Sequence, residues 1–214
     1  MAANPDTKKI LALLKTRFPK EKIFLSHQNL WELCVATILS AQCTDKRVNE
    51  VTTKLFKKYK KLGDYVLADP REFEREIFST GFYKNKTKNI LVAAKKIKKE
   101  FNGCVPKTMN ELITIPGIGR KTANIVLSQG HGLHEGIAVD THVQRLSQRL
   151  GLSGNKTPEK IEQDLMRLVK PGEYGWLSTA LIQHGRQTCK AQKPHCAGCF
   201  LRGACPSAFS FAKK

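Results

Sequence analysis

The chain has 214 residues, and its 37 lysine and arginine residues outnumber its 18 aspartate and glutamate residues, which gives a formal charge of +19. Because this excess is spread along the sequence, it favours a polyanionic partner, above all nucleic acid, over a merely solvated lysine-rich surface or a contact with acidic lipids. No apolar run approaches the roughly 18–20 residues of a membrane-spanning helix, and the N-terminus lacks the apolar core of a secretory signal, so we expect an intracellular protein without a membrane contact.

Helical periodicity runs through almost the whole chain, and no alternating strand pattern appears. Apolar residues recur at helical spacing through 10–18, 30–42, 48–59, 70–77, 90–97, 108–115 and 121–128, and Thr157-Pro158 opens a further helix. Asp45 is placed to cap the third of these helices, and Thr108 and Glu111 form a T-x-x-E capping box before the sixth. Short helices joined by short loops predict an all-α fold.

A glycine-rich turn, Pro116–Gly119, separates two of the predicted helices in the stretch I-P-G-I-G-R-K-T-A. Gly117 and Gly119 permit positive φ and a close approach of a phosphate, and the N–H groups of such a turn can bind an anion. Ile118 can fill the space between the two helices. Because the basic pair Arg120-Lys121 follows directly, the turn predicts a contact with a DNA backbone rather than an ordinary helix–helix connection.

Lys121 and Asp140 are the candidate reacting groups. A DNA strand bound at the turn would lie next to the Lys121 amine, and an amine with a carboxylate nearby is the minimal equipment for amine nucleophilic chemistry. Near a sugar, Asp140 could stabilise an oxocarbenium-like centre or accept a proton from the amine. The ordinary alternatives are a surface lysine and a helix N-cap, and the cap role is compatible with catalysis because it fixes the carboxylate.

Four of the seven cysteines lie close together near the C-terminus, which suggests a metal site rather than disulfides. Their spacing is C-x6-C-x2-C-x5-C, formed by Cys189, Cys196, Cys199 and Cys205. Zinc more often uses two C-x2-C pairs, whereas iron–sulfur clusters accept uneven loops, so the spacing favours iron–sulfur and leaves zinc open. The loop after the first cysteine carries Lys190 and Lys193, and a basic loop pinned by a metal site predicts a second contact with the DNA backbone.

Six stretches together carry a family resemblance. They are L-S-A-Q-C-T-D (39–45), G-F-Y-K-N-K (81–86), I-P-G-I-G-R-K-T-A-N (115–124), A-V-D-T-H (138–142), H-G-R (184–186) and the cysteine cluster. In this combination the chain strongly resembles endonuclease III, the family of bifunctional DNA glycosylase/lyases in the helix-hairpin-helix superfamily.

The resemblance implies an all-α fold with a six-helix barrel domain over 23–131 and a cluster domain formed by 1–22 and 132–214, with a DNA groove between them. It implies a [4Fe–4S] cluster on the four cysteines. It also implies that the partner is double-stranded DNA containing damaged pyrimidines or abasic sites. We expect a monomer, because one protein can bind one lesion site. The compact chain fits a prokaryotic cytoplasm, in association with the nucleoid.

The resemblance further implies the mechanism. A damaged pyrimidine is flipped out of the duplex, Lys121 attacks the deoxyribose C1′, a Schiff base forms, and β-elimination cuts the strand on the 3′ side, with Asp140 assisting. Gln42 would fill the hole left by the base, Phe82 would wedge between bases of the opposite strand, and His142 would join the DNA contacts.

Two departures from the family pattern and two other functions stay open at this point. Cys43 stands where the family often has a small, alanine-like residue, and Phe82 is bulkier than the expected aliphatic residue, which leaves lesion and opposite-base preference open. A monofunctional mismatch glycosylase of the same superfamily usually lacks a lysine at the position of Lys121. A non-enzymatic DNA-binding iron–sulfur protein would bind DNA without cutting it.

Overall fold

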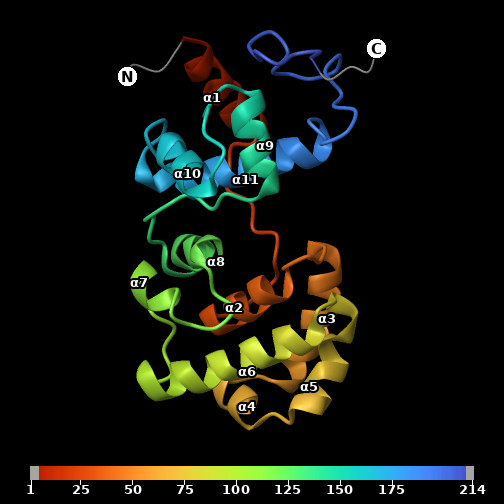
Figure 1. The fold of residues 1–214 in the computed structure, drawn as a ribbon, viewed down its shortest axis with the longest axis vertical. Helices are drawn as coiled ribbons and strands as arrows, with labels where there is room; N and C mark the ends of the chain where they lie inside the picture. Colours follow the sequence, from red (N-terminus) through yellow and green to blue (C-terminus); the bar gives the residue numbers. More distant parts are fainter. Residues whose placement is uncertain (1–4, 211–214) are drawn as a thin grey trace. The chain divides into compact units, whose positions relative to one another are not determined.

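The computed structural model describes residues 5–210, and every regular element in that range is helical (Figure 1). The predicted all-α fold is therefore confirmed for the described part of the chain. No helix in this range is long and apolar enough to cross a membrane.

The chain divides into two compact units. The central unit runs from Ile23 to Leu133, and the terminal unit combines the residues up to Lys22 with those from His134 onward. Each unit has its own hydrophobic core.

The central unit is built around a buried helix. Its elements are α2 (Leu30–Leu39), α3 (Asp45–Lys58), α4 (Leu62–Leu67), α5 (Pro70–Ile77), the 3-10 helix η1 (Phe78–Thr80), α6 (Tyr83–Glu100), α7 (Met109–Leu112), α8 (Arg120–Ile125) and the π-helix η2 (Val126–His131). All of α2 after its first residue is buried, because its sequence is apolar on every face. The amphipathic helices α3 and α6 bury one face each, and their lysines face outward except for the buried Lys86 on α6.

Three predicted helix boundaries in this unit need correction. The helix predicted over 30–42 ends at Leu39, because Gln42 has a φ of 53° and cannot continue a right-handed helix. Asp45 is the first residue of α3 and not its cap, since the Thr44 hydroxyl accepts the Arg47 N–H (3.3 Å). The helix predicted over 121–128 reaches His131, and its second half widens into the π-helix η2.

The terminal unit joins the two ends of the chain. Its elements are α1 (Pro5–Arg17), α9 (Thr141–Arg149), α10 (Pro158–Met166), the 3-10 helix η3 (Pro171–Glu173) and α11 (Tyr174–Gln187). Trp176 on α11 is buried and donates its indole N–H to the Phe18 carbonyl (2.6 Å), and Lys15 on α1 pairs with Glu173 (3.0 Å). These contacts hold α1 against α11, so the N-terminal helix is part of the C-terminal core.

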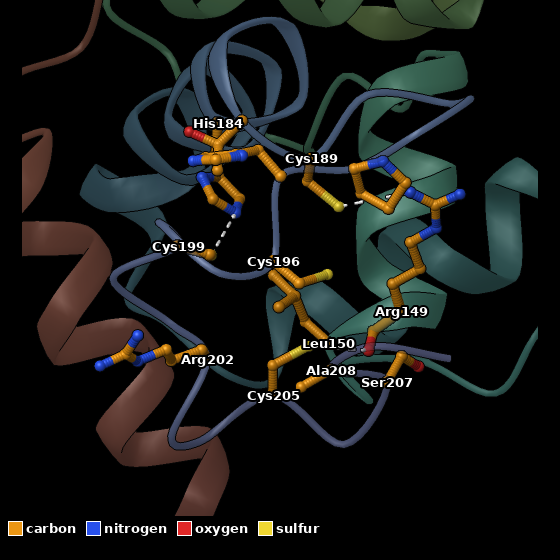
Figure 2. A pocket seen from close by; sticks show the side chains of 13 residues that line it. Arg149, Leu150, His184, Cys189, Cys196, Cys199, Arg202, Cys205, Ser207 and Ala208 are labelled. Carbon is orange, nitrogen blue, oxygen red and sulfur yellow. Dashed lines mark hydrogen bonds between the residues drawn. The ribbon is translucent and has the colours of Figure 1, made fainter. Parts of the chain in front are cut away.

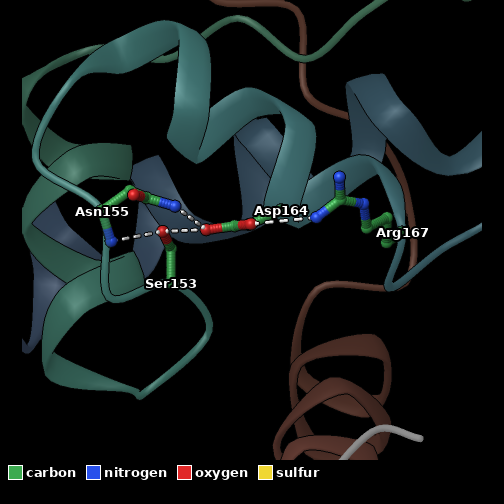
Figure 3. A network of polar contacts seen from close by, with 4 residues as sticks. All are labelled: Ser153, Asn155, Asp164 and Arg167. Carbon is green, nitrogen blue, oxygen red and sulfur yellow. Dashed lines mark hydrogen bonds and ion pairs between the residues drawn. The ribbon is translucent and has the colours of Figure 1, made fainter. Parts of the chain in front are cut away.

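A polar network holds the loop between α9 and α10 (Figure 3). The Asp164 carboxylate accepts the Ser153 hydroxyl (2.6 Å) and the Asn155 side-chain N–H (2.7 Å), and it faces Arg167 at 3.5 Å. The hydrogen bonds from Ser153 and Asn155 lower the pKa of the Asp164 carboxyl. A single carboxylate on α10 therefore orders the preceding loop.

We expect the Asp164→Ala substitution to lower the free energy of unfolding by about 1–2 kcal/mol at about pH 7, because it removes two hydrogen bonds to a carboxylate. Since the pKa of this group is lowered in the folded state, its stabilisation is present above the unfolded value of about 3.9 and is lost as the pH falls through the folded value. Urea denaturation of the wild type and the variant should thus show a difference that shrinks below about pH 4. The matched control is the exposed neighbour Gln163→Ala, and a difference that did not change with pH would contradict this role.

Candidate functional site

The glycine-rich turn connects α7 to α8 in the central unit. The Thr108 hydroxyl accepts the Glu111 N–H (3.3 Å) and donates to the Glu111 carboxylate (2.6 Å), so the predicted pair does begin α7. Ile118 is 3% exposed and donates its N–H to the Ile115 carbonyl (3.0 Å). The apolar residue at the centre of the turn is thus buried, as the sequence predicts.

The two glycines of the turn have different roles. Gly117 has a φ of +83°, and a Cβ there would lie 3.1 Å from Cβ of Asn89 and 3.3 Å from the Ile38 side chain. Gly119 has a φ of −89°, so the prediction of positive φ holds only for Gly117, and a Cβ at Gly119 would meet nothing within 4 Å. Gly117 lets the turn pack against α2 and α6, whereas Gly119 leaves open space at the start of α8.

Lys121 is the second residue of α8, one position after Arg120, and both side chains are exposed. Gly119, the residue before α8, accepts the Ala123 N–H through its carbonyl (2.9 Å), which continues the turn directly into the helix. An exposed primary amine therefore stands in the first turn of a helix beside an open backbone, where a bound strand could reach it.

Asp140 caps α9 in the terminal unit. Its Oδ1 accepts the Val143 N–H (2.8 Å), which satisfies one of the free N–H groups at the start of that helix. The segment before it is also held, since the Ser178 hydroxyl donates to the Ala138 carbonyl (2.7 Å) and Glu162 accepts the Ile137 N–H (3.2 Å). The Asp140 carboxylate is thus held by its own hydrogen bond and by the anchored segment that precedes it.

The cap uses only one of the two carboxylate oxygens of Asp140. Within residues 5–210, no hydrogen bond is recorded to Oδ2, and the residue is half-buried. A fixed carboxylate with one oxygen unused can act on a bound molecule without giving up its structural role. The capping role of Asp140 is therefore confirmed, and it is compatible with the catalytic role that the sequence also predicts.

The four clustered cysteines line one pocket in the terminal unit (Figure 2). Arg149, His184 and Arg202 line the same pocket. Within the described range, no three histidine, cysteine, aspartate or glutamate side chains converge closely enough to hold a single metal ion. Four thiols that share one pocket could together hold a metal centre.

Several polar groups contact these sulfurs. Arg149 Nη1 lies 3.4 Å from Sγ of Cys189, and His184 Nε2 lies 3.7 Å from Sγ of Cys199. Burial, and after it the neighbouring thiols, raises the pKa of Cys199 and of Cys205. Because thiols bind metals as thiolates, a cationic centre in this pocket would offset that cost.

Two arginines of α9 hold the basic loop that follows Cys189. Arg149 donates to the carbonyls of Lys190 (2.8 Å) and Ala191 (2.9 Å), and Arg145 donates to the Cys189 carbonyl (3.1 Å). Lys190 and Lys193 are exposed. Their backbone is thus anchored while their ammonium groups face solvent.

Sequence reasoning missed Arg145 and Arg149 as site residues. Arg145 also donates to the Gly185 carbonyl (3.2 Å) and lies 3.1 Å from Nδ1 of His142. The spacing of four between the two arginines, on the helix that Asp140 begins, was the available signal. It could not show that both guanidinium groups point at main-chain carbonyls.

Gln42 and Phe82 lie in the central unit with the turn and Lys121. Gln42 is exposed, and the Phe82 side chain is 62% exposed, so Phe82 is not the core aromatic that the sequence left as its alternative. Both have left-handed backbone, with φ of 53° and 48°. The structure therefore places the four cysteines in one pocket and assigns Lys121 and Asp140 to different units.

Comparisons with known proteins identify relatives of this chain. Residues 35–171 match the family model described as HhH-GPD superfamily base excision DNA repair protein. An Endonuclease III from Synechocystis sp. is 50% identical to this chain over 199 residues, which cover 93% of this chain and 91% of the relative.

Two solved structures are also similar to it at 39% sequence identity. One is a non-covalent Endonuclease III-DNA complex, with a TM-score of 0.90 over 96% of this chain and 97% of that one. The other is a trapped Endonuclease III-DNA covalent intermediate, described as an estranged-adenine complex, with a TM-score of 0.89 over 96% and 98% of the two chains.

Proposed function

Because this chain belongs to the HhH-GPD superfamily and, within it, to the endonuclease III family, we propose specific roles for its residues in base excision repair. The protein is a DNA glycosylase with AP lyase activity that acts on duplex DNA. The observation that carries the residue assignment is the exposed Lys121 amine beside the open turn at Gly119, in a fold that matches a trapped covalent DNA intermediate. Its proposed substrates are damaged pyrimidines and abasic sites, and its proposed place of action is the nucleoid of a prokaryotic cell.

Lys121 is the nucleophile. The lone pair of its Nζ attacks C1′ of the deoxyribose, and the bond from C1′ to the base breaks, so the base leaves with that electron pair and takes up a proton. The sugar ring then opens to a Schiff base between Nζ and C1′. Loss of a proton from C2′ expels the 3′ phosphate by β-elimination, and water finally hydrolyses the Schiff base to free the lysine.

Asp140 is the acid–base partner. Its unused Oδ2 can stabilise the positive charge that develops on the sugar as the base leaves, and it can accept the proton that the Lys121 ammonium must lose. Its Oδ1 is held by the Val143 N–H, so the group is oriented before the substrate binds. Rigid placement of this kind lowers the cost of reaching the transition state.

The phosphate grip comes from two basic segments, one in each unit. In the central unit, the turn from Pro116 to Gly119 offers an open backbone with Arg120 beside it. In the terminal unit, Lys190 and Lys193 stand on the loop anchored by Arg149, and His142 lies two residues after Asp140. Contacts of this type hold any DNA sequence and weaken as salt rises.

Gln42 and Phe82 act on the base stack. The exposed Phe82 ring is an apolar wedge that can separate stacked bases, and Gln42 can replace the hydrogen bonds of the base that leaves. As a wedge, Phe82 would bear on the opposite-strand base more than on the chemistry at C1′.

The four clustered cysteines hold an iron–sulfur cluster, and we assign it as [4Fe–4S]. In support, the four thiols line one pocket, and their uneven spacing is typical of iron–sulfur ligation rather than of zinc. A cationic centre would also offset the burial that raises the pKa of Cys199 and Cys205. When bound, the cluster would serve mainly as a structural brace. The carbonyls of the basic loop receive their hydrogen bonds from Arg149 and Arg145 next to that brace.

We expect the purified protein to be brown and to contain four iron and four sulfide ions per chain. Elemental analysis and visible absorbance are the measurements. The Cys199→Ser variant should lose the visible absorbance and bind DNA more weakly, whereas Cys104→Ser, a change at an exposed cysteine outside the pocket, should alter neither. One zinc ion per chain in a colourless protein would refute this assignment.

The Lys121→Ala variant should give no covalent adduct when borohydride is added to the enzyme on a duplex with a single damaged pyrimidine. It should keep DNA affinity within about threefold of the wild type, because most of the grip comes from other contacts. The matched control is Lys98→Ala, an exposed lysine at the far end of α6, which should leave trapping unchanged.

Borohydride trapping also distinguishes this enzyme from a monofunctional glycosylase and from a non-enzymatic DNA-binding protein. Base release without an adduct in the wild type would place the enzyme among monofunctional glycosylases that use water. Tight binding with neither product would favour a protein that only binds DNA.

Two substitutions of Asp140 should separate its catalytic role from its capping role. Asparagine caps a helix about as well as aspartate, so Asp140→Asn should change the free energy of unfolding by less than about 0.5 kcal/mol and slow base excision about 100-fold or more. Asp140→Ala should slow excision as much and also cost about 1 kcal/mol of stability. Single-turnover kinetics and thermal unfolding are the measurements, and normal excision by a stable Asp140→Asn variant would leave only the cap.

A further inference from the structure

The backbone at Gln42 and Phe82 has a conformation that is unfavourable by itself. Both residues have positive φ without being glycine, at 53° and 48°. Such conformations cost free energy and persist only where the surrounding structure holds them. Some contact must therefore fix the two loops from which these side chains project.

The ammonium group of Lys86 makes that contact. Its Nζ donates to the Leu39 carbonyl (2.8 Å) and to the Thr80 carbonyl (2.8 Å), and the residue is only 4% exposed. Leu39 is the last residue of α2, three positions before Gln42, and Thr80 lies two positions before Phe82. One buried cation thus joins the two segments that carry the base-contacting residues.

Leu39 ends α2 and Thr80 ends η1, and the carbonyls at such helix ends explain why a cation is placed there. The last carbonyls of a helix have no partner within the helix, and they form the negative end of its dipole. Leu39 is buried at the end of α2, and Lys86 donates to its carbonyl. Lys86 is 4% exposed, and this burial lowers its pKa.

Further hydrogen bonds stabilise each of the two loops next to the Lys86 contact. In the first loop, the Cys43 N–H donates to the Ser40 carbonyl (3.1 Å). In the second, the Thr80 hydroxyl donates to the Ile77 carbonyl (2.8 Å), and the Phe82 carbonyl accepts the Lys86 N–H (3.1 Å). Figure 1 shows α2, at whose end the first loop begins, and α6, into which the second loop leads.

We infer that Lys86 is a positioning residue for base extrusion: its buried ammonium group joins the end of α2 to the turn before α6, so that Gln42 and Phe82 meet the duplex as one rigid pair. This inference rests on the proposed roles of those two residues. It assigns to Lys86 no contact with the reacting sugar.

The role predicts a specific kinetic pattern. Extrusion of a paired, stacked base costs free energy, and it costs least where the base is already missing. If Phe82 and Gln42 are held less rigidly, excision of a damaged base should therefore slow much more than cleavage at a preformed abasic site. A residue that only stabilised the fold would slow both reactions together.

The test compares Lys86→Met with the wild type in single-turnover reactions on two duplexes that differ only at the lesion. We expect base excision at a damaged pyrimidine to fall at least about tenfold and strand cleavage at an abasic site to fall less than about threefold. Binding of a duplex with 2-aminopurine next to the lesion should also give a smaller rise in fluorescence, because the neighbouring bases are unstacked less.

Two controls complete the comparison. Lys88→Met removes the same charge from an exposed position on the same helix and should leave both rates unchanged. In a Gln42→Ala, Phe82→Ala background, Lys86→Met should slow excision less than about twofold further, since the residues through which it acts are gone. Lys86→Gln, which keeps a neutral donor, should fall between the wild type and Lys86→Met, and it carries the same comparison if the methionine variant does not fold.

The outcomes separate this role from the function itself. An equal loss in both reactions that follows the loss of thermal stability, an unchanged excision rate, or a full effect in the double-alanine background would overturn the positioning role. A wild type that cleaves neither duplex would instead overturn the proposed function.

Discussion

Hydrogen bonds from buried or half-buried cationic side chains to main-chain carbonyls are the interaction on which the working surfaces of this protein depend. Lys86 holds the ends of two loops in the central unit, and Arg145 and Arg149 hold the loop after Cys189 in the terminal unit. In each case the loop carbonyls have lost their helical partners and need donors. A long side chain from a neighbouring helix supplies those donors from a rigid base.

These hydrogen bonds position exposed side chains by fixing the backbone that carries them. In their proposed roles, Phe82, Lys190 and Lys193 reach a large ligand, and their side chains are exposed rather than packed. The loops that carry them are anchored through main-chain carbonyls instead. The same logic applies to the proposed role of Asp140, whose one oxygen is held by a helix N–H while the other would act on the substrate.

The excess positive charge acts at longer range than these contacts. A formal charge of +19 draws the enzyme to any duplex and cannot distinguish a damaged base from an intact one. Discrimination falls to the few residues that touch the base stack and to the chemistry at C1′. Phe82 and Gln42 are the residues that we propose for the contact with the base stack.

The helical class, the turn, the cysteine cluster and the candidate nucleophile could all be predicted from the sequence, because each is a local pattern. Helical periodicity, P-G-x-G and C-x6-C-x2-C-x5-C are set by neighbouring residues along the chain. The helix ends were less accurate: α2 stops at Leu39 and Thr44 caps α3, since loop geometry and competing caps decide such boundaries.

What only the tertiary structure decided are contacts between residues far apart in the sequence. The sequence does not distinguish Lys86 from the other lysines of its helix, and its partner Leu39 lies 47 positions away. Arg149 likewise reaches a carbonyl 41 positions further along the chain. The sequence by itself determined which chemical groups are present and in which local order. The fold alone decided which of the many cations are buried against a carbonyl and which face the solvent, because burial depends on the packing of distant segments.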